Sequence, residues 1–146
     1  MSKSILLVED NRSDELLTLR AFKKANIANE IVVVRDGAEA LDYLFGTGPY
    51  VGRDTSDVPT LTLLDLNLPR IDGVEVLRRI REDERTKYLP VVMLTASKEQ
   101  ADLSRTHSFG VNAYVCKPVD FGEFVEAVKS IGVFWLLLNE PAPRPR

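Results

Sequence analysis

The sequence is poor in several features that mark particular classes of protein. It has one cysteine, Cys116, so no disulfide can form within the chain, which fits a reducing compartment and predicts a cytoplasmic location. No apolar stretch approaches the roughly 18 residues that a transmembrane helix needs, and no signal-peptide pattern is present, so we expect no membrane anchor. Lysine and arginine form no long block and the net charge is -3, which argues against nucleic acid as the main partner.

The composition that remains is that of an ordinary globular domain. Of the 146 residues, 45% are apolar and 28% are charged. Strand-like apolar runs alternate five times with amphipathic helical stretches. The strand-like runs are residues 4–8, 31–34, 61–64, 91–94 and 113–115, and the helical stretches are 13–25, 36–45, 74–80, 98–109 and one that begins near 120. Short, continuous apolar strands between amphipathic helices predict an α/β fold with a doubly wound, five-stranded parallel sheet.

Some segments carry local signals of their own. Asp36 is expected to cap a helix, with Glu39 completing a capping box. Residues 46–59 contain three glycines and two prolines, which predicts a long exposed loop. Residues 139–146 end in Pro-Ala-Pro-Arg-Pro-Arg and are expected to form a disordered tail, so the folded domain is placed at 1–138.

Acidic side chains follow two of the strand-like runs. Glu9 and Asp10 end the first run, and Asp65 ends the third. In a parallel sheet these positions meet at the carboxyl edge, where ligands bind. Two like charges about 4 Å apart cost about 4 kcal/mol at an effective dielectric constant of about 20. A hard cation with oxygen ligands offsets that repulsion, so the sequence predicts a Mg²⁺ site.

Asp65 is also a candidate nucleophile. It interrupts an apolar run between Leu64 and Leu66, and a buried acid there is costly unless the site uses it. Its carboxylate could accept a phosphoryl group and form an acyl phosphate. Lys117 ends the fifth run and would offset the charge of that group, while Thr95 ends the fourth and offers a hydroxyl. Such a transfer depends mainly on charge neutralisation and positioning.

These residues belong to a set of motifs that resembles the receiver domain of two-component response regulators over roughly residues 3 to 138. The matching motifs are Val8-Glu9-Asp10, Leu64-Asp65-Leu66-Asn67-Leu68-Pro69, Asp72-Gly73, Leu94-Thr95-Ala96 and Lys117-Pro118. The resemblance implies the flavodoxin-like (βα)5 receiver fold. It also implies that Asp65 is the phosphoacceptor and that the chain catalyses only its own phosphorylation and slow dephosphorylation.

The resemblance further implies a division of roles at the site. Mg²⁺ would be bound by Asp10, Asp65 and the main-chain carbonyl of Asn67, with Glu9 contributing through water. The phosphoryl group would be contacted by Thr95 and Lys117. Tyr114 resembles the aromatic residue that swings inward when Thr95 moves, so these two residues would form the switch.

Within that family the chain is most similar to the small regulators paired with phytochrome-type histidine kinases. The stretches that carry this similarity are Arg35-Asp36-Gly37, Ala40-Leu41-Asp42-Tyr43-Leu44, the 46–59 loop and Phe134-Trp135-Leu136. The implied partner is a histidine kinase of the bacterial phytochrome type. The only histidine, His107, is interpreted as a solvated helix residue, so the chain is not itself expected to be a kinase or a histidine phosphotransfer protein.

A run of five large apolar residues, 134–138, follows the last helical stretch. Successive helical positions turn by about 100°, so these residues cannot all face one core. We therefore expect a homodimer through the last strand and helix, with an interface that includes Phe134, Trp135, Leu137 and Leu138. The alternative is that this segment folds back onto its own domain. The weakly apolar stretch 98–109 is a candidate mobile output surface.

The residues leave more than one function open. The first is a single-domain response regulator that takes phosphate from a kinase and changes its protein association, or that serves as a phosphate sink in a phosphorelay. The second is an aspartate-nucleophile phosphatase, but that chemistry usually needs a second acid where this chain has Asn67. The third is a flavodoxin-like cofactor carrier, although Glu9 and Asp10 would repel a phosphate without a metal.

Overall fold

The computed structural model describes residues 4–27, 29–66, 68–95, 110–111, 113–116 and 121–131. The elements in chain order are β1 (Ile5–Val8), α1 (Arg12–Lys24), β2 (Ile31–Val34), α2 (Gly37–Phe45), the 3-10 turn η1 (Gly48–Tyr50), β3 (Leu61–Asp65), α3 (Gly73–Glu82), β4 (Val91–Thr95), β5 (Ala113–Cys116) and α5 (Phe121–Ile131). All strand pairs are parallel, in the order β2-β1-β3-β4-β5. The predicted doubly wound α/β fold is thus confirmed. The expected helix at 98–109 and the segments at 132–138 and 139–146 lie outside the described residues.

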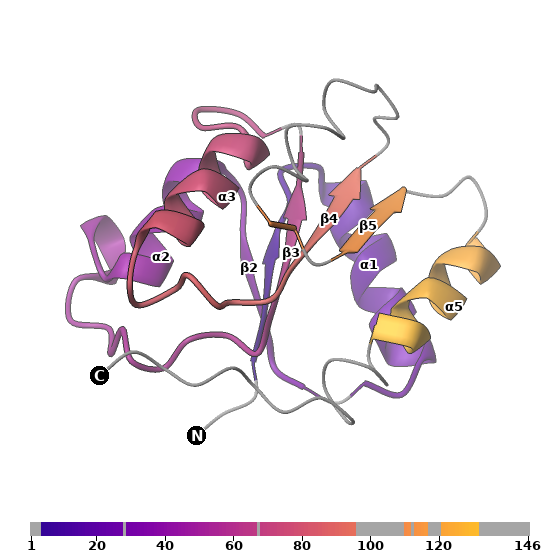
Figure 1. Ribbon diagram of the computed structural model, residues 1–146. Coiled ribbons are helices and arrows are strands. Elements are labelled where there is room, and N and C mark those ends of the chain that lie inside the picture. The colour runs from indigo at the N-terminus through magenta and orange to yellow at the C-terminus, as the bar shows by residue number, and fades with distance from the viewer. Residues whose placement is uncertain are drawn as a thin grey trace.

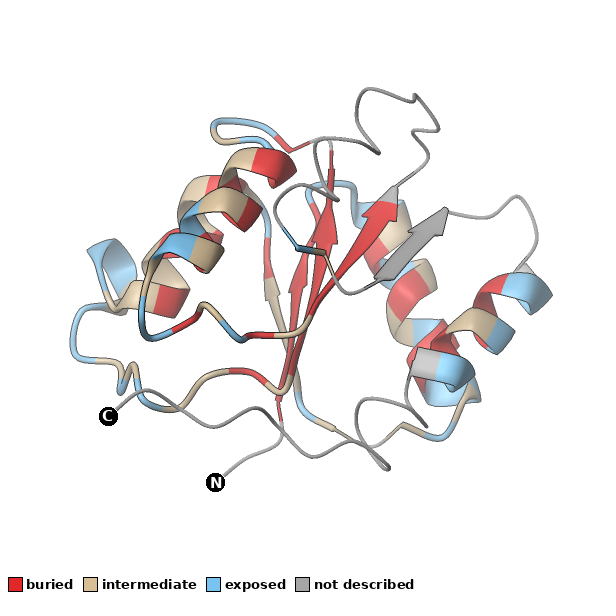
Figure 2. Ribbon diagram, viewed as in Figure 1, coloured by how far each residue is buried: buried red, intermediate tan, exposed pale blue. Residues whose placement is uncertain are grey.

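The sheet is the middle of three layers. α2 and α3 lie on one side of it, and α1 and α5 lie on the other (Figure 1). The strands β1 and β3 are buried along their whole length, which explains why β1 is continuously apolar and β3 is mostly so, rather than alternating (Figure 2). β2, at the edge, is only partly buried. Among the helices of the described residues, none has the length and apolar character that crossing a bilayer requires.

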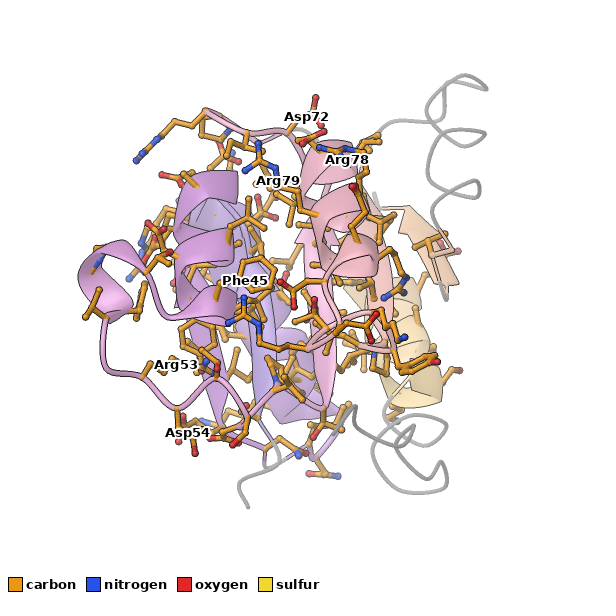
Figure 3. The ribbon with its side chains drawn as sticks, turned by 60° about the vertical axis from the view of Figure 1, so that its left-hand side comes forward. Phe45, Arg53, Asp54, Asp72, Arg78 and Arg79 are labelled. Carbon is orange, nitrogen blue, oxygen red and sulfur yellow. The ribbon has the colours of Figure 1, made fainter. Side chains whose placement is uncertain are left out.

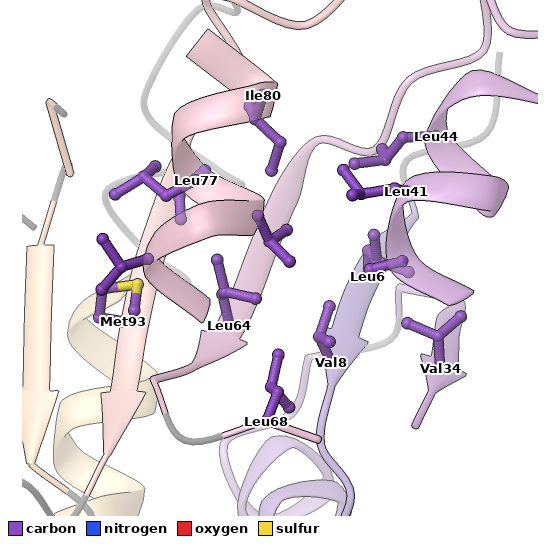
Figure 4. Close-up of a cluster of buried hydrophobic side chains, with 14 of the residues drawn as sticks. Leu6, Val8, Val34, Leu41, Leu44, Leu64, Leu68, Leu77, Ile80 and Met93 are labelled. Carbon is purple, nitrogen blue, oxygen red and sulfur yellow. The ribbon is translucent and has the colours of Figure 1, made fainter. Parts of the chain in front are cut away.

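Each face of the sheet has its own hydrophobic core. The core under α2 and α3 includes Leu64, Leu77 and Met93, and Figure 4 shows these side chains between the two helices and the strands. The core under α1 and α5 is centred on Phe22 and Phe124. Because successive strand residues point to opposite faces, both cores are supplied by the same strands.

Polar side chains fix the starts of the helices near the carboxyl edge of the sheet. The N-cap side chains of α1, α2 and α3 are Asn11, Asp36 and Asp72, which accept hydrogen bonds from the backbone N–H groups of Asp14, Glu39 and Glu75. The predicted cap at Asp36 is present, because the Asp36 Oδ1 atom accepts a hydrogen bond from the Glu39 backbone nitrogen at 2.7 Å. Glu39, however, accepts the backbone N–H of Arg35 rather than that of the cap residue, so the predicted capping box is shifted by one residue.

The 46–59 loop is more tightly held than an exposed loop would be. The guanidinium of Arg53, labelled in Figure 3, lies 3.9 Å from the ring centroid of Tyr43 on α2. It donates hydrogen bonds to the carbonyl oxygens of Tyr43 at 2.9 Å and Asp57 at 2.6 Å. Tyr50 packs edge-on against Tyr43, with ring centroids 5.2 Å apart. These contacts attach the loop to α2, which its glycine and proline content did not reveal.

Candidate functional site

Three carboxylates meet at the carboxyl edge of the sheet. Val8 of β1 pairs with Leu64 of β3, so the next residues, Glu9 and Asp65, are neighbours across the same pair of strands. One carboxylate oxygen from each of Glu9, Asp10 and Asp65 lies within 4.8 Å of the other two. The structure therefore brings together the three acids that the sequence placed at strand ends.

The environment of these acids suits a hard cation. Glu9 is fully buried and Asp65 is 6% exposed, whereas Asp10 is exposed. The backbone N–H of Asn11 donates to Glu9 Oε2 at 3.3 Å. Buried carboxylates so close together need positive charge, because burial weakens the screening of their repulsion. A set made only of carboxylate oxygens, open to solvent through Asp10, fits a divalent metal such as Mg²⁺ or Mn²⁺.

The remaining expected site residues come from β4, β5 and their ends. Asp65 pairs with Leu94, and the next residue, Thr95, ends β4 opposite Cys116. Tyr114 lies in β5 opposite Met93. The structure therefore places Thr95 and Tyr114 on adjacent strands, next to the strand of Asp65. The side chains of Thr95 and Tyr114, and all of Asn67 and Lys117, lie outside what is described.

The start of α3 packs directly against the end of β3. Gly73, the first residue of α3, donates its N–H to the carbonyl of Leu66 at 2.9 Å. A Cβ atom on Gly73 would lie 2.1 Å from the carbonyl oxygen of Asp65, so no side chain fits there. The Asp72-Gly73 pair is a sequence signal for this contact, but the sequence does not show which backbone the glycine approaches.

A second charged group beside the acids was missed by the sequence reasoning. Glu15 of α1 is 3% exposed. It accepts a hydrogen bond from Arg12 Nη1 at 2.8 Å and forms an ion pair with Arg35, which follows β2 directly. The hydrogen bond and the negative charge of Glu15 raise the pKa of the Arg35 guanidinium. A contact across 20 positions leaves no periodic signal in the sequence.

The expected dimer residues fall outside the described part of the chain. These residues are Phe134, Trp135, Leu137 and Leu138. Within the described ranges, the large hydrophobic side chains that are exposed are Leu16, Val51 and Tyr88, on α1, after η1 and before β4.

Comparison with known proteins identifies one family and several relatives that match nearly the whole chain. The family described as response regulator receiver domain matches residues 5–129. Among curated proteins, the chain is 43% identical over 140 residues to the probable methanogenesis regulatory protein FilR2 of Methanothrix harundinacea, covering 95% of this chain and 88% of that protein. It is 39% identical over 134 residues to response regulator Rcp1 of Synechocystis sp., covering 92% and 89%.

Solved structures are similar over nearly the whole chain. The phosphorylated cyanobacterial phytochrome response regulator RcpA has 38% identity and a TM-score of 0.87, covering 98% of this chain and 100% of its own. The Mn²⁺-bound form of Rcp1 has 36% identity and a TM-score of 0.85, covering 97% and 99%. The bacteriophytochrome response regulator AtBRR has 52% identity and a TM-score of 0.77, covering 96% and 99%.

Proposed function

The chain belongs to the response regulator receiver domain family, and from that membership we propose that Asp65 accepts a phosphoryl group from a histidine kinase. The observation that carries the proposal is the approach of the Glu9, Asp10 and Asp65 oxygens to within 4.8 Å at the carboxyl edge of the sheet. Asp65 ends a buried strand and is nearly buried itself, so its carboxylate is held in one place by the core behind it. This fixed position favours in-line attack.

The proposed cofactor is Mg²⁺, bound by Asp10, Asp65 and the main-chain carbonyl of Asn67, with Glu9 contributing through water. The carboxylates of this set fit a hard cation, and the structure of the relative Rcp1 is an Mn²⁺-bound form. When bound, the metal supplies positive charge that offsets the repulsion between the acids and the incoming phosphoryl group. Glu9, fully buried, adds negative charge that favours a cation at this edge.

The proposed transfer is a displacement at phosphorus. An oxygen of Asp65 forms a bond to phosphorus as the nitrogen–phosphorus bond of the phosphohistidine breaks, and the imidazole nitrogen keeps the bonding electron pair. The Thr95 hydroxyl donates a hydrogen bond to a phosphoryl oxygen, and the Lys117 ammonium offsets its charge. Water later hydrolyses the acyl phosphate and restores Asp65. The chain thus catalyses only its own phosphorylation and slow dephosphorylation.

The proposed output is a change in protein association. Thr95 and Tyr114 lie on adjacent strands, β4 and β5, so a shift of one towards the phosphoryl group can be transmitted to the other. We propose that the receiver domain spans 1–138, followed by the tail 139–146, and that the chain forms a homodimer through the last strand and helix.

The phytochrome response regulators RcpA and AtBRR among its relatives support a phytochrome-type kinase as the partner, and with it a cytoplasmic location.

The test is phosphorylation of the wild type and of Asp65→Asn by a labelled phytochrome-type histidine kinase in Mg²⁺. Labelling should be abolished in Asp65→Asn, because an amide cannot form the acyl phosphate. Asp54→Asn, in the exposed part of the 46–59 loop, is the matched control and should be labelled like the wild type. Undiminished labelling of Asp65→Asn would refute the assignment of the phosphoacceptor.

A further inference from the structure

A cluster of opposite charges lies beside Glu9, Asp10 and Asp65, the three acids that we call the acidic pocket. We call Arg12, Glu15 and Arg35 the Glu15 cluster. The side chain of Glu15 is 4% exposed and is held between the two guanidinium groups. The side chains of Arg12 and Arg35 remain 67% and 51% exposed. Two cations share one buried anion, so these three side chains together carry net positive charge, although the Glu39 carboxylate also acts on Arg35.

Strand register places Arg35 in line with the acidic pocket. Val8 of β1 pairs with Val34 of β2 and with Leu64 of β3. The next residue on each strand therefore gives the row Arg35, Glu9 and Asp65. The backbone N–H of Glu9 donates to the carbonyl of Val34 at 3.0 Å, which keeps β2 beside β1 up to this row. Neighbouring strands are about 4.8 Å apart, so the Cα atoms of Arg35 and Asp65 are separated by about 10 Å.

The side chains of this row also share a face of the sheet. Arg35 reaches Glu15, which lies on α1. Leu63, two residues before Asp65, belongs to the core under α1 and α5. Residues two apart on a strand point to the same face, so Asp65 faces α1 as well. Arg35 is therefore at the rim of the pocket and on its α1 side.

We propose that Arg35, held in place by Glu15, attracts the incoming phosphoryl dianion to the acidic pocket. This inference rests on the proposed phosphorylation of Asp65. A phosphodonor must approach three clustered carboxylates, whose negative charge the divalent cation and the proposed Lys117 ammonium together only balance, so nothing at the site itself offsets the charge of a dianionic donor. An exposed guanidinium at the rim lowers that repulsion along the approach. Arg70, another cation at this edge, is paired one to one with Asp36 at 3.4 Å, whereas the Glu15 cluster has two guanidinium groups for one carboxylate.

The same positive charge should disfavour the metal. Arg35 repels a divalent cation at the pocket while it attracts a dianionic donor. Removing its charge should therefore strengthen Mg²⁺ binding and weaken capture of the phosphodonor. A variant that merely disturbed the fold around β2 would weaken both, so the two opposite signs distinguish steering from a structural role.

The experiment compares the wild type with Arg35→Gln, Arg35→Lys and Lys24→Gln. Lys24→Gln makes the same change in net charge at the exposed far end of α1. The second-order rate constant for labelling is measured with acetyl phosphate at saturating Mg²⁺, at low and at high ionic strength. In this reaction the Asp65 oxygen–phosphorus bond forms as the phosphorus–oxygen bond to acetate breaks, and acetate leaves with the electron pair. Mg²⁺ affinity is measured separately, by calorimetry without donor.

At low salt, Arg35→Gln should be labelled about two- to fivefold more slowly than the wild type. At high salt the two should converge, because the screening length falls to a few ångströms. Arg35→Lys should recover most of the rate. The Mg²⁺ affinity of Arg35→Lys should stay near that of the wild type, whereas Arg35→Gln should bind Mg²⁺ about two- to fivefold more tightly than the wild type. Phosphoramidate, which carries less negative charge than acetyl phosphate, should show a smaller loss of rate.

Several results would overturn the proposal. Arg35→Gln could be labelled as fast as the wild type at low salt, lose rate equally at every salt concentration, or lose Mg²⁺ affinity together with rate. An equal loss in Lys24→Gln would show an effect of overall net charge rather than of the rim. A wild type that is not labelled at all would instead contradict the proposed function, so the two failures are distinguishable.

Discussion

Gly73 and Asp65 are in such close backbone contact that a Cβ atom on the glycine would lie 2.1 Å from the aspartate carbonyl oxygen. The same atom would lie 2.9 Å from Cα of Leu66, so the obstruction is main chain and cannot rotate away. The hydrogen bond from Gly73 N–H to the Leu66 carbonyl holds the two segments in this contact. The position of Asp65 thus depends on the start of α3.

Replacing Gly73 by alanine should push the start of α3 away from the end of β3. We expect a loss of about 1–3 kcal/mol in the free energy of unfolding, as for other overpacked sites, and slower phosphorylation of Asp65. Urea unfolding and labelling by acetyl phosphate measure the two effects. Gly122→Ala, at an exposed position of α5, is the control and should be neutral or slightly stabilising. Normal stability and labelling of Gly73→Ala would contradict the contact.

Replacing Thr62 in β3 by an apolar residue should stabilise the protein. Thr62 is fully buried, and its hydroxyl has no hydrogen-bond partner among the residues that the structure describes. Desolvating such a group costs about 1–3 kcal/mol, and valine has nearly the same shape. Thr62→Val should therefore raise the free energy of unfolding by about 1 kcal/mol. A decrease in the urea midpoint would show that the hydroxyl makes a favourable contact.

Thr86→Val is the matched substitution with the opposite expected sign. Thr86 is 1% exposed, and its hydroxyl donates to the carbonyl of Ile80, in the last turns of α3, at 2.7 Å. Valine removes this buried hydrogen bond and leaves the shape almost unchanged. The free energy of unfolding should fall by about 1 kcal/mol in the same urea assay. If Thr62→Val and Thr86→Val changed the free energy of unfolding in the same direction, the hydrogen bonding of the two hydroxyls would not explain the effects of these substitutions.

Glu75 should make stability depend on pH in the acid range. Hydrogen bonds from Arg78 and then Arg79 lower the pKa of its carboxyl to about 2. A lowered pKa in the folded state contributes stability above the ordinary value of 4.5, and that contribution is lost as the pH falls towards about 2. Because these side chains are partly exposed, solvent screening limits the contribution to about 1 kcal/mol or less.

Replacing Glu75 by glutamine tests this dependence. The variant should be slightly less stable than the wild type at pH 7, and the gap should narrow as the pH falls below 4.5. Urea unfolding at several pH values measures the gap, and an NMR titration of the Glu75 carboxyl gives its pKa directly. Glu30→Gln, at an exposed position before β2, is the control. A carboxyl that titrates near 4.5 would contradict the ion pairs with the two arginines.

The sequence predicted the sheet well because its buried strands are short and mostly apolar. The runs expected to stop at Leu64 and Leu94 extend one residue further, so Asp65 and Thr95 are the last residues of their strands. A search for apolar residues ends a strand too early when a polar residue continues the backbone pairing. The clustering of Glu9 with Asp65 was predictable for a different reason, since parallel strands bring their carboxyl ends to one edge.

The parts that were not predictable depend on contacts between distant segments. Glu15 is buried on a helix by an arginine 20 positions away, and an acidic residue in a first helical turn would ordinarily be assigned to solvent. The attachment of Arg53 to Tyr43 is similar, because it needs the loop to return over α2. Such pairs have no periodicity, so composition and spacing carry no sign of them.

The expected homodimer provides a last prediction. On α5, Phe124, Val125 and Val128 are already buried in the core under α1 and α5, so that stripe is used within the chain. For the five apolar residues at 134–138 we expect a second copy of the chain as the partner, and a stable interface buries about 1,200–2,000 Å² in total. Sedimentation at tens of micromolar should show a dimer for the wild type and a monomer for Phe134→Ala/Leu137→Ala. The control Leu16→Ala/Val51→Ala removes exposed apolar side chains elsewhere and should remain dimeric. A wild type that sediments as a monomer, with and without phosphorylation, would favour the alternative that the segment folds back onto its own domain.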